Sequence, residues 1–311
     1  TRAIDKALNM TLAEQEVSMK ELRKIVSQFN IFHWVKIYMD KLKEVKELQR
    51  SLKSRHVDLD IGKSISKLYS NASKRIIFLD YDGTLVNFNS DINKARPDQA
   101  LYELLAKLTK DESNEIVIIS GRNYKEMKEW FGNSGVHLIA EHGVWQKQKQ
   151  GKWISILGLT DFWKEDIFPI LNTYVERTPG AFIEEKSFSL VWHYRKVPKE
   201  LGDLRASELV NNLEYLIKDK GLQILPGNKV IEIKNIEVNK GKAALNQMLN
   251  KDYDFVMAVG DDHTDEDTFK ALPDSALTFK VGSSMSAAQF YLRNTLEVRQ
   301  FLLRLISESN Q

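Results

Sequence analysis

The sequence predicts an α/β protein with a parallel sheet, an inserted α+β module and an N-terminal helical segment. From Lys74 onward, short apolar runs alternate with helical patterns, as they do when crossover helices join the strands of a sheet. Residues 145 to about 225 break this rhythm with an alternating strand pattern. The first 48 residues, in contrast, show helical spacings of apolar residues.

The N-terminal segment is predicted to form two helices. Thr11 and Glu14 have the spacing of a capping box, and apolar residues at helical spacing follow them. A second apolar stripe then needs a partner surface, either on its own chain or on a neighbouring domain of which it is a remnant. Its members are Ile31, Trp34, Val35, Tyr38, Met39, Leu42, Val45 and Leu48. The chain begins at Thr1 within a helical pattern rather than at Met, which favours an excerpt of a longer protein, and residues 51–71 are interpreted as a polar connector.

Four near-continuous apolar runs are predicted to be parallel strands, because a strand that is covered on both faces has no polar side. They are residues 76–79, 116–119, 136–139 and 255–259. Between the first two runs, Pro97 opens a helix whose leucines share one face.

The inserted module is predicted from residues 187–194, where bulky apolar residues alternate with polar and smaller ones. This alternation indicates a half-exposed antiparallel strand, whose apolar side would be covered by helices at 161–176 and 201–218. The expected division is a helical segment with its connector at 1–60, a first part of the core at 61–144, the module at 145–225 and the second part of the core at 226–311.

Composition excludes several classes of protein. The 311 residues hold 45 basic and 43 acidic side chains, a balance that lacks the basic footprint of a nucleic-acid-binding protein. The absence of cysteine excludes disulfides, thiolate zinc sites and a cysteine nucleophile, and it favours an intracellular compartment. No apolar run approaches the roughly 18 residues of a membrane span, so we expect a soluble, cytoplasmic protein.

Acidic residues follow the predicted strands, at the sheet edge where ligands bind in open α/β folds. Asp80 and Asp82 follow the first strand, and residues 120–122 follow the second. A cluster at 260–265 follows the late strand. Carboxylates at one edge repel one another unless a cation lies among them, and an all-oxygen ligand set suits Mg²⁺ best. The six histidines are scattered, which argues against zinc.

Each motif alone has a purely structural interpretation. The Asp-x-Asp-Gly-Thr of residues 80–84 can be a turn, and the Ser-Gly-Arg of 120–122 can be a helix cap. The acidic run can be the start of a helix that Thr264 caps. Their order, and their common position at strand ends, favours a functional site.

The combination resembles the haloacid-dehalogenase-like superfamily and implies its Rossmannoid core. The first motif of that superfamily matches Asp80 to Thr84, and the second matches Ser120. The Lys of the third motif best matches Lys240, with Lys242 as a nearby competitor. The resemblance implies a phosphatase in which Asp80 attacks phosphorus and forms an aspartyl-phosphate.

The remaining roles also come from this resemblance. Asp82 is expected to be the general acid and base, while Ser120 and Lys240 bind the phosphoryl oxygens. Mg²⁺ is expected on the carboxylates of Asp80 and Asp261 and on the backbone carbonyl of Asp82. The acidic fourth motif of the superfamily matches Asp261 and Asp262, and Asp262 and Asp265 are expected to surround the metal.

A narrower resemblance, over roughly residues 74–305, is to the trehalose-phosphate phosphatases. The segments that carry it are Thr178–Gly180, Ile183–Arg195, Ala140–Gly143, Val230–Ile233, Val238–Gly241 and Gly260–Asp267. His263 departs from the family, in which Arg or an apolar residue is more usual, and this difference concerns substrate contacts rather than metal binding. The resemblance implies trehalose 6-phosphate as substrate and the inserted module as a lid that excludes water.

Sugar contacts are expected on the module. Glu184 and Lys186 share one strand face, and Glu141 and Arg195 are further candidates by the same resemblance. A surface salt bridge is the alternative for Glu184 and Lys186. His193 is expected to be an ordinary hydrogen-bonded strand histidine.

The N-terminal segment resembles the closing part of a trehalose-phosphate synthase domain and implies a synthase partner, in cis or in trans. The residues that carry this resemblance are Ile4, Ala7, Leu8, Met10 and Trp34. Two other functions stay open, namely hydrolysis of sucrose phosphate or a hexose phosphate, and a catalytically silent domain that binds the sugar phosphate and regulates a synthase. Because every expected catalytic position is filled, a phosphatase is favoured.

Overall fold

The computed structural model describes residues 2–28, 31, 35, 38, 39, 41–43, 54–88, 95–156, 158–282 and 285–308. The chain divides into two compact units, Thr1–Leu52 and Lys53–Gln311. Among the described residues, every helix is too short or too polar to span a lipid bilayer.

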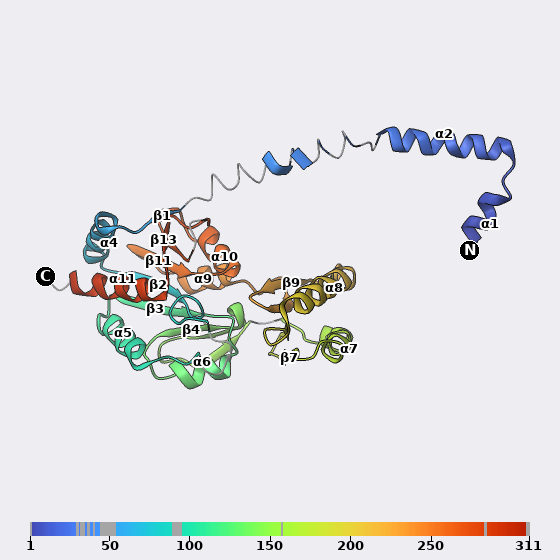
Figure 1. Cartoon of the computed structure of the whole chain (residues 1–311). Helices are drawn as coiled ribbons and strands as arrows, with labels where there is room; N and C mark the ends of the chain where they lie inside the picture. Colours follow the sequence, from blue (N-terminus) through green and yellow to red (C-terminus); the bar gives the residue numbers. More distant parts are fainter. Residues whose placement is uncertain are drawn as a thin grey trace. The chain divides into compact units, whose positions relative to one another are not determined.

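The first unit contains α1 (Arg2–Leu8) and α2 (Leu12–Gln28) (Figure 1). The predicted capping box of α2 is confirmed, because the backbone N–H of Thr11 donates to Glu14 Oε2 at 2.8 Å and that of Glu14 donates to Thr11 Oγ1 at 3.4 Å. Of the second predicted helix, Trp34, Val45 and Leu48 lie outside the described residues. The described residues of its stripe that are exposed are Ile31, Val35, Tyr38 and Met39.

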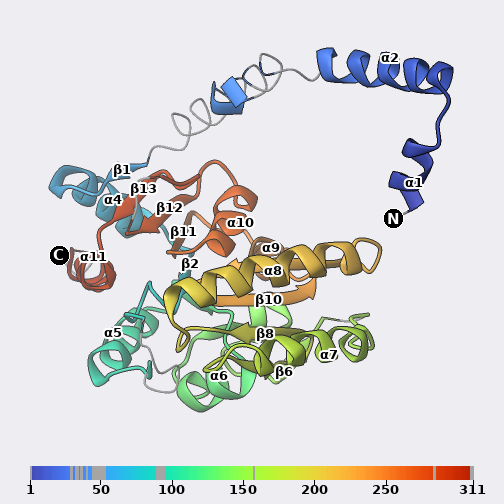
Figure 2. The same cartoon turned by 45° about the vertical axis from the view of Figure 1, so that its right-hand side comes forward.

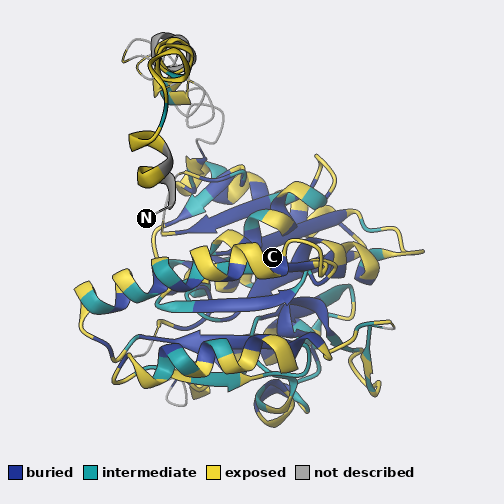
Figure 3. Ribbon diagram, turned by 90° about the vertical axis from the view of Figure 1, so that its right-hand side faces the viewer, coloured by how far each residue is buried: buried dark blue, intermediate teal, exposed yellow. Residues whose placement is uncertain are grey.

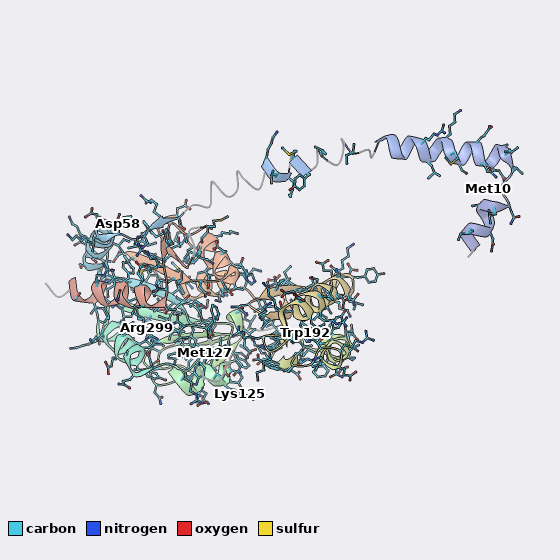
Figure 4. The ribbon with its side chains drawn as sticks, in the orientation of Figure 1. Met10, Asp58, Lys125, Met127, Trp192 and Arg299 are labelled. Atoms are coloured by element: carbon cyan, nitrogen blue, oxygen red, sulfur yellow. The ribbon has the colours of Figure 1, made fainter. Side chains whose placement is uncertain are left out.

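The prediction of a connector at 51–71 is wrong, because the described part of this stretch holds β1 (Arg55–His56) and α4 (Leu59–Asn71). Asp58, labelled in Figure 4, caps α4 by accepting a hydrogen bond from the backbone N–H of Ile61 at 2.8 Å. Ile65 and Tyr69 of α4 are buried against the core. The apolar residues that bury this helix are few and are separated by Ser, Lys and Gly. The helical spacing of apolar residues is therefore weak in its sequence.

In the described part of the chain, the larger sheet has nine strands in the order β1-β13-β12-β11-β2-β3-β4-β5-β6. From β1 to β4 all neighbours are parallel, whereas β5 and β6 are antiparallel additions at the other edge. Beyond β1, the strands are β2 (Arg75–Asp80), β3 (Asn114–Ile119), β4 (His137–Ala140), β5 (Trp145–Lys147), β6 (Trp153–Ser155), β11 (Phe255–Gly260), β12 (Leu277–Val281) and β13 (Phe290–Leu292). The four predicted parallel strands are therefore confirmed.

Helices cover both faces of this sheet, which explains why its strands lack a polar side. One face packs against α4, α5 (Gln99–Lys110), α6 (Tyr124–Phe131) and α11 (Thr295–Glu308). The other packs against α9 (Lys240–Met248) and α10 (His263–Ala271). In Figure 3 most strands are coloured as buried, and exposed residues lie on the helices and in the loops.

The smaller sheet is antiparallel throughout, in the order β7-β8-β10-β9. Its strands are β7 (Phe182–Glu185), β8 (Ser189–His193), β9 (Leu222–Gly227) and β10 (Val230–Asn235). Helices α7 (Trp163–Glu176) and α8 (Lys199–Ile217) cover one face (Figure 2). Trp192, labelled in Figure 4, is fully buried in the core that they form.

The structure moves the predicted edges of this module. β5 and β6 belong to the larger sheet although they lie within the predicted module of 145–225, and β10 belongs to the smaller sheet although it lies after residue 225. The expected half-exposure of β8 is also wrong, because all five of its residues are buried. Its apolar side packs under α7 and α8, while its polar side faces buried ionisable groups and a cavity.

Candidate active site

The fold brings the strand-end motifs to one edge of the larger sheet. Asp80 is the last residue of β2, Ser120 follows β3, and Asp261 follows β11. β2 pairs with β3 on one side and β11 on the other, so the strand order reverses at β2. Such a switch point leaves a crevice outside the strand ends, where ligands of α/β proteins bind.

Asp80 and Lys240 are buried in this crevice and in direct contact. Lys240 Nζ lies 2.7 Å from Asp80 Oδ1 and 2.8 Å from Asp265 Oδ1. Lys240 begins α9, and the side chain of the preceding Asn239 caps that helix. Lys242 is exposed, so of the two candidate lysines it is Lys240 that reaches Asp80.

A cluster of carboxylates surrounds this pair. Asp80, Asp261 and Asp265 each bring one oxygen within 4.8 Å of the others. Burial raises the pKa of Asp80 to about 8 and that of Asp261 to about 7, and the neighbouring carboxylates add to the effect. Asp80 Oδ2 is buried without a hydrogen-bond partner among the described residues. A hard divalent cation fits this donor set, because it would occupy the unpaired oxygen and offset the repulsion.

Asp265 is held by other contacts. Its Oδ1 accepts from Lys240, and its Oδ2 accepts from the backbone N–H groups of Asp261 and Asp262 at 3.0 and 3.1 Å. Because these bonds occupy both oxygens, Asp80 and Asp261 are the carboxylates best placed to hold a cation.

Asp262 begins α10. Its Oδ1 accepts from the backbone N–H groups of Thr264 and Asp265, so Asp262 is the cap of this helix and the interpretation of Thr264 as the cap is wrong. Burial alone would raise the pKa of Asp262, but the charge of Lys240 and the hydrogen bond from Thr264 hold it below its ordinary value. The side chain therefore stays ionised at the edge of the carboxylate cluster.

The carboxylate of Asp82 pairs with Arg122, a residue that the sequence analysis did not single out. Arg122 Nε donates to Asp82 Oδ2 and Arg122 Nη2 donates to Oδ1, both at 2.7 Å. The backbone N–H of Arg122 also donates to Ser120 Oγ at 3.2 Å. The signal that could have found Arg122 is its place in the Ser-Gly-Arg motif, two residues after the strand-end Ser120.

A cavity of about 320 Å³ lies between this sheet edge and the inserted module. The predicted site residues that line it are Asp80, Asp82, Ser120, Lys240, Asp262, Glu184, Lys186 and Arg195. His263 also lines it. The volume falls in the range of about 300–1,000 Å³ that is typical of small-molecule sites.

The salt-bridge alternative pairs Glu184 with Lys186, but in the structure each of them contacts a different residue. Glu184 Oε2 lies 2.8 Å from His193 Nε2, so His193 is hydrogen-bonded as expected. Lys186 Nζ donates to the backbone carbonyl of Gly121 at 2.9 Å and lies 3.4 Å from Glu232 Oε1. Lys186 therefore ties the module to the loop after β3.

Glu141 is not among the residues that line the cavity, contrary to the expectation of a sugar contact. It lies in a short 3₁₀ turn after β4 and accepts hydrogen bonds from the backbone N–H and the Oγ of Ser187 at 3.0 and 3.1 Å. Its carboxylate joins the core to the module.

Glu232 and His142 complete a buried network that sequence reasoning missed. Glu232 accepts from Ser189 Oγ at 2.7 Å, and its Oε2 lies 3.1 Å from His142 Nε2. Burial alone would raise the pKa of Glu232, but Lys186 and His142 hold it well below its ordinary value. Both residues lie in segments that carry the narrower resemblance, Ala140–Gly143 and Val230–Ile233, but no role was predicted for either.

Comparison with known proteins decides the family. The sequence model of trehalose-phosphatases matches residues 78–295, more than half of the chain. This chain belongs to the trehalose-phosphatase family. As a trehalose-phosphatase family member it has the predicted core motifs and the inserted module within the matched range.

Two curated relatives show how this family member compares with complete proteins. The trehalose-phosphatase of Saccharomyces cerevisiae is 32% identical over 87% of this chain and 33% of its own length. The bifunctional trehalose-6-phosphate synthase/phosphatase of Thermoproteus tenax is 31% identical over 97% of this chain and 42% of its own length. The chain thus spans well under half the length of these relatives.

Solved structures agree on the fold. The C-terminal domain of Candida albicans trehalose-6-phosphate phosphatase has a TM-score of 0.77 and 28% identity, and the match covers 82% of this chain and 98% of that one. A haloacid dehalogenase-like hydrolase from Bacteroides thetaiotaomicron shares the fold at a TM-score of 0.53 and 13% identity, over 74% of this chain and 99% of that one. The predicted haloacid-dehalogenase-like fold is confirmed.

Proposed function

We propose that this chain hydrolyses trehalose 6-phosphate to trehalose and inorganic phosphate, with Mg²⁺ as cofactor. The observation that carries the proposal is Asp80, which lies at the switch point against Lys240 with one oxygen unpaired. The names of the trehalose-phosphatase relatives support the choice of substrate.

In the first step, an oxygen of Asp80 forms a bond to phosphorus and the ester bond to the sugar breaks. The electron pair of the broken bond stays on the sugar oxygen, which takes a proton from Asp82. Lys240 balances the negative charge of the phosphoryl oxygens, and Ser120 binds these oxygens. In the second step, water attacks phosphorus, gives a proton to Asp82 and displaces the carboxylate of Asp80, which releases phosphate.

Mg²⁺ would be held by Asp80 and Asp261, together with the backbone carbonyl of Asp82. It would supply positive charge next to the phosphoryl oxygens, where negative charge concentrates during transfer. Asp262 and Asp265 would keep these ligands in place through their backbone and lysine contacts.

Sugar recognition would fall to the module side of the cavity. Glu184, Lys186 and Arg195 line it and can bond hydroxyl groups. The names of bifunctional relatives support a trehalose-phosphate synthase domain as partner, in cis or in trans.

Phosphate release from a panel of sugar phosphates, with Mg²⁺ and with chelator, tests the proposal. Trehalose 6-phosphate should be turned over with Mg²⁺ and should not be turned over with chelator. Preference for sucrose phosphate or a hexose phosphate would change the substrate, and binding of trehalose 6-phosphate without turnover would indicate a regulatory domain.

Replacing the nucleophile tests the mechanism. Asp80→Asn should reduce turnover by at least about 10³-fold, because an amide cannot form the phosphoenzyme. Thermal unfolding should show an intact fold, since the buried carboxylate of Asp80 repels its neighbours. Asp111→Asn is the control, because Asp111 pairs with Arg75 at the opposite end of β2. Retained turnover in Asp80→Asn would refute the role of Asp80.

A further inference from the structure

Arg122 donates two parallel hydrogen bonds to the carboxylate of Asp82. Nε and Nη2 lie 2.7 Å from the two oxygens of Asp82, a side-on arrangement that fixes the plane and direction of the carboxylate as well as its position. Asp82 itself follows β2 in a turn, where the backbone N–H of Gly83 donates to the carbonyl of Val86. The side chain of Asp82 is 27% exposed and lines the cavity, so the arginine restrains a group that could otherwise rotate.

Arg122 is itself held on several sides. Its side chain is 7% exposed, and its guanidinium carbon lies 4.6 Å from the ring centroid of Trp130 and 5.5 Å from that of Tyr81. Nη1 donates to Glu126 at 3.1 Å. A planar group that packs against two rings and bonds to Glu126 has little freedom, so the position of the Asp82 carboxylate is set by the core.

We propose that Arg122 is a positioning residue that holds Asp82 in the orientation needed to give its proton to the departing sugar oxygen. The inference rests on the proposed function, in which Asp82 is the general acid. In that step the proton passes from Asp82 to the ester oxygen as the bond to phosphorus breaks, so the effect of Arg122 depends on how much the leaving group needs a proton.

The leaving group can be changed to isolate this effect. A sugar alkoxide is a poor leaving group and needs the proton, whereas para-nitrophenolate departs without one. The ratio kcat/KM covers the steps up to departure of the leaving group, so it excludes hydrolysis of the phosphoenzyme. Arg122→Gln should lower kcat/KM for trehalose 6-phosphate by about 10- to 100-fold, and for para-nitrophenyl phosphate by less than about 3-fold. Arg122→Lys keeps the positive charge but cannot form the two parallel hydrogen bonds to Asp82. It should therefore show a smaller loss of kcat/KM than Arg122→Gln, but not the wild-type value.

A double variant shows whether Arg122 acts through Asp82. Asp82→Asn should give the same dependence on the leaving group, and adding Arg122→Gln should cause no further loss of kcat/KM for trehalose 6-phosphate. Two independent losses that multiply would mean that Arg122 contacts the substrate directly, and this would overturn the inference.

Arg75→Gln is the matched control for folding. Arg75 is also buried, over the ring of Tyr69, and also bonds a carboxylate, but at the other end of β2. Arg75→Gln should lower the melting temperature without changing the ratio of the kcat/KM values for trehalose 6-phosphate and para-nitrophenyl phosphate. Equal losses on both substrates in Arg122→Gln, with trehalose 6-phosphate turnover intact in the wild type, would overturn the inference alone. If the wild type turns over neither substrate, the proposed function fails and the inference fails with it.

Discussion

The ionisation of individual side chains around the cavity depends on their burial as much as on their hydrogen-bond and charge partners. His142 is bonded to Glu232, yet its burial lowers its pKa to about 4, and the nearby charge of Lys234 adds to the effect. The histidine is therefore neutral in the folded chain at neutral pH. Its backbone is also in the left-handed region, at φ 57°, which is uncommon for a residue other than glycine.

Protonation of His142 should oppose folding in mild acid. The ordinary pKa of histidine in an unfolded chain is about 6.5, so between that pH and about 4 the unfolded state binds more protons than the folded state. The free energy of unfolding contributed by this group should therefore fall as the pH drops through this window, by up to about 3 kcal/mol at about 1.4 kcal/mol per pKa unit. Denaturant unfolding at a series of pH values measures it.

His142→Gln should flatten that pH dependence relative to the wild type. His56→Gln is the matched control, because His56 lies on β1 at the edge of the larger sheet and pairs with Glu297. If His142→Gln and the wild type lost stability equally between pH 6.5 and 4, another group would be responsible.

At the scale of elements, the first turn of α9 determines which lysine reaches the site. Asn239 caps the helix by accepting from the backbone N–H groups of Gly241 and Lys242 at 2.7 and 3.1 Å. Its Nδ2 also donates to Asp267 of α10 at 2.7 Å. Lys240 follows the cap directly, so the cap sets the direction of its side chain toward Asp80.

Asn239→Ala should lower both stability and activity. Loss of an N-cap costs about 1 kcal/mol, and loosening of the first turn should reduce kcat, by an expected factor on the order of 10, because Lys240 would no longer be held against Asp80. Thermal unfolding and phosphate release measure the two effects. Lys242→Ala is the control in the same turn, and it should change neither, since Lys242 contacts Glu237 on the surface. A similar loss of activity in Lys242→Ala would mean that the two lysines share the role.

For the whole molecule, the cavity requires both the core and the inserted module. Their contacts include Lys186 with Gly121, Glu232 with His142, and Ser187 with Glu141. All the proposed site residues belong to the unit Lys53–Gln311. The unit Thr1–Leu52 contributes none of them.

Deletion of residues 1–52 should therefore leave kcat/KM for trehalose 6-phosphate within about 2-fold of the full chain, since the remaining unit holds the entire cavity. Its melting temperature should also be retained. Phosphate release and thermal unfolding of the two forms, measured side by side, check this prediction. A loss of more than about 10-fold in the shortened form would show that the first unit supports the site.

Local patterns were sufficient for the four predicted parallel strands, β2, β3, β4 and β11, and for the acidic residues at strand ends. Burial on both faces requires an uninterrupted apolar run, which can be read without knowing the neighbours. Helix α4 was missed because its few apolar positions lie among polar residues, and they become a buried face only against the core. The predicted edges of the module were wrong for a similar reason. The sequence of a strand does not indicate which of two sheets the strand joins.

The sequence alone determined the α/β core and the inserted module, and it predicted Asp80, Ser120 and Asp261 as candidate site residues at strand ends, because each depends on a short run followed by a polar residue. Only the tertiary structure decided which partners these residues have. Lys240 and Asp80 are 160 residues apart, His142 and Glu232 are 90 apart, and Arg122 and Asp82 are 40 apart. Such pairs are set by strand order and by the packing of the module on the core, and local periodicity carries no information on either.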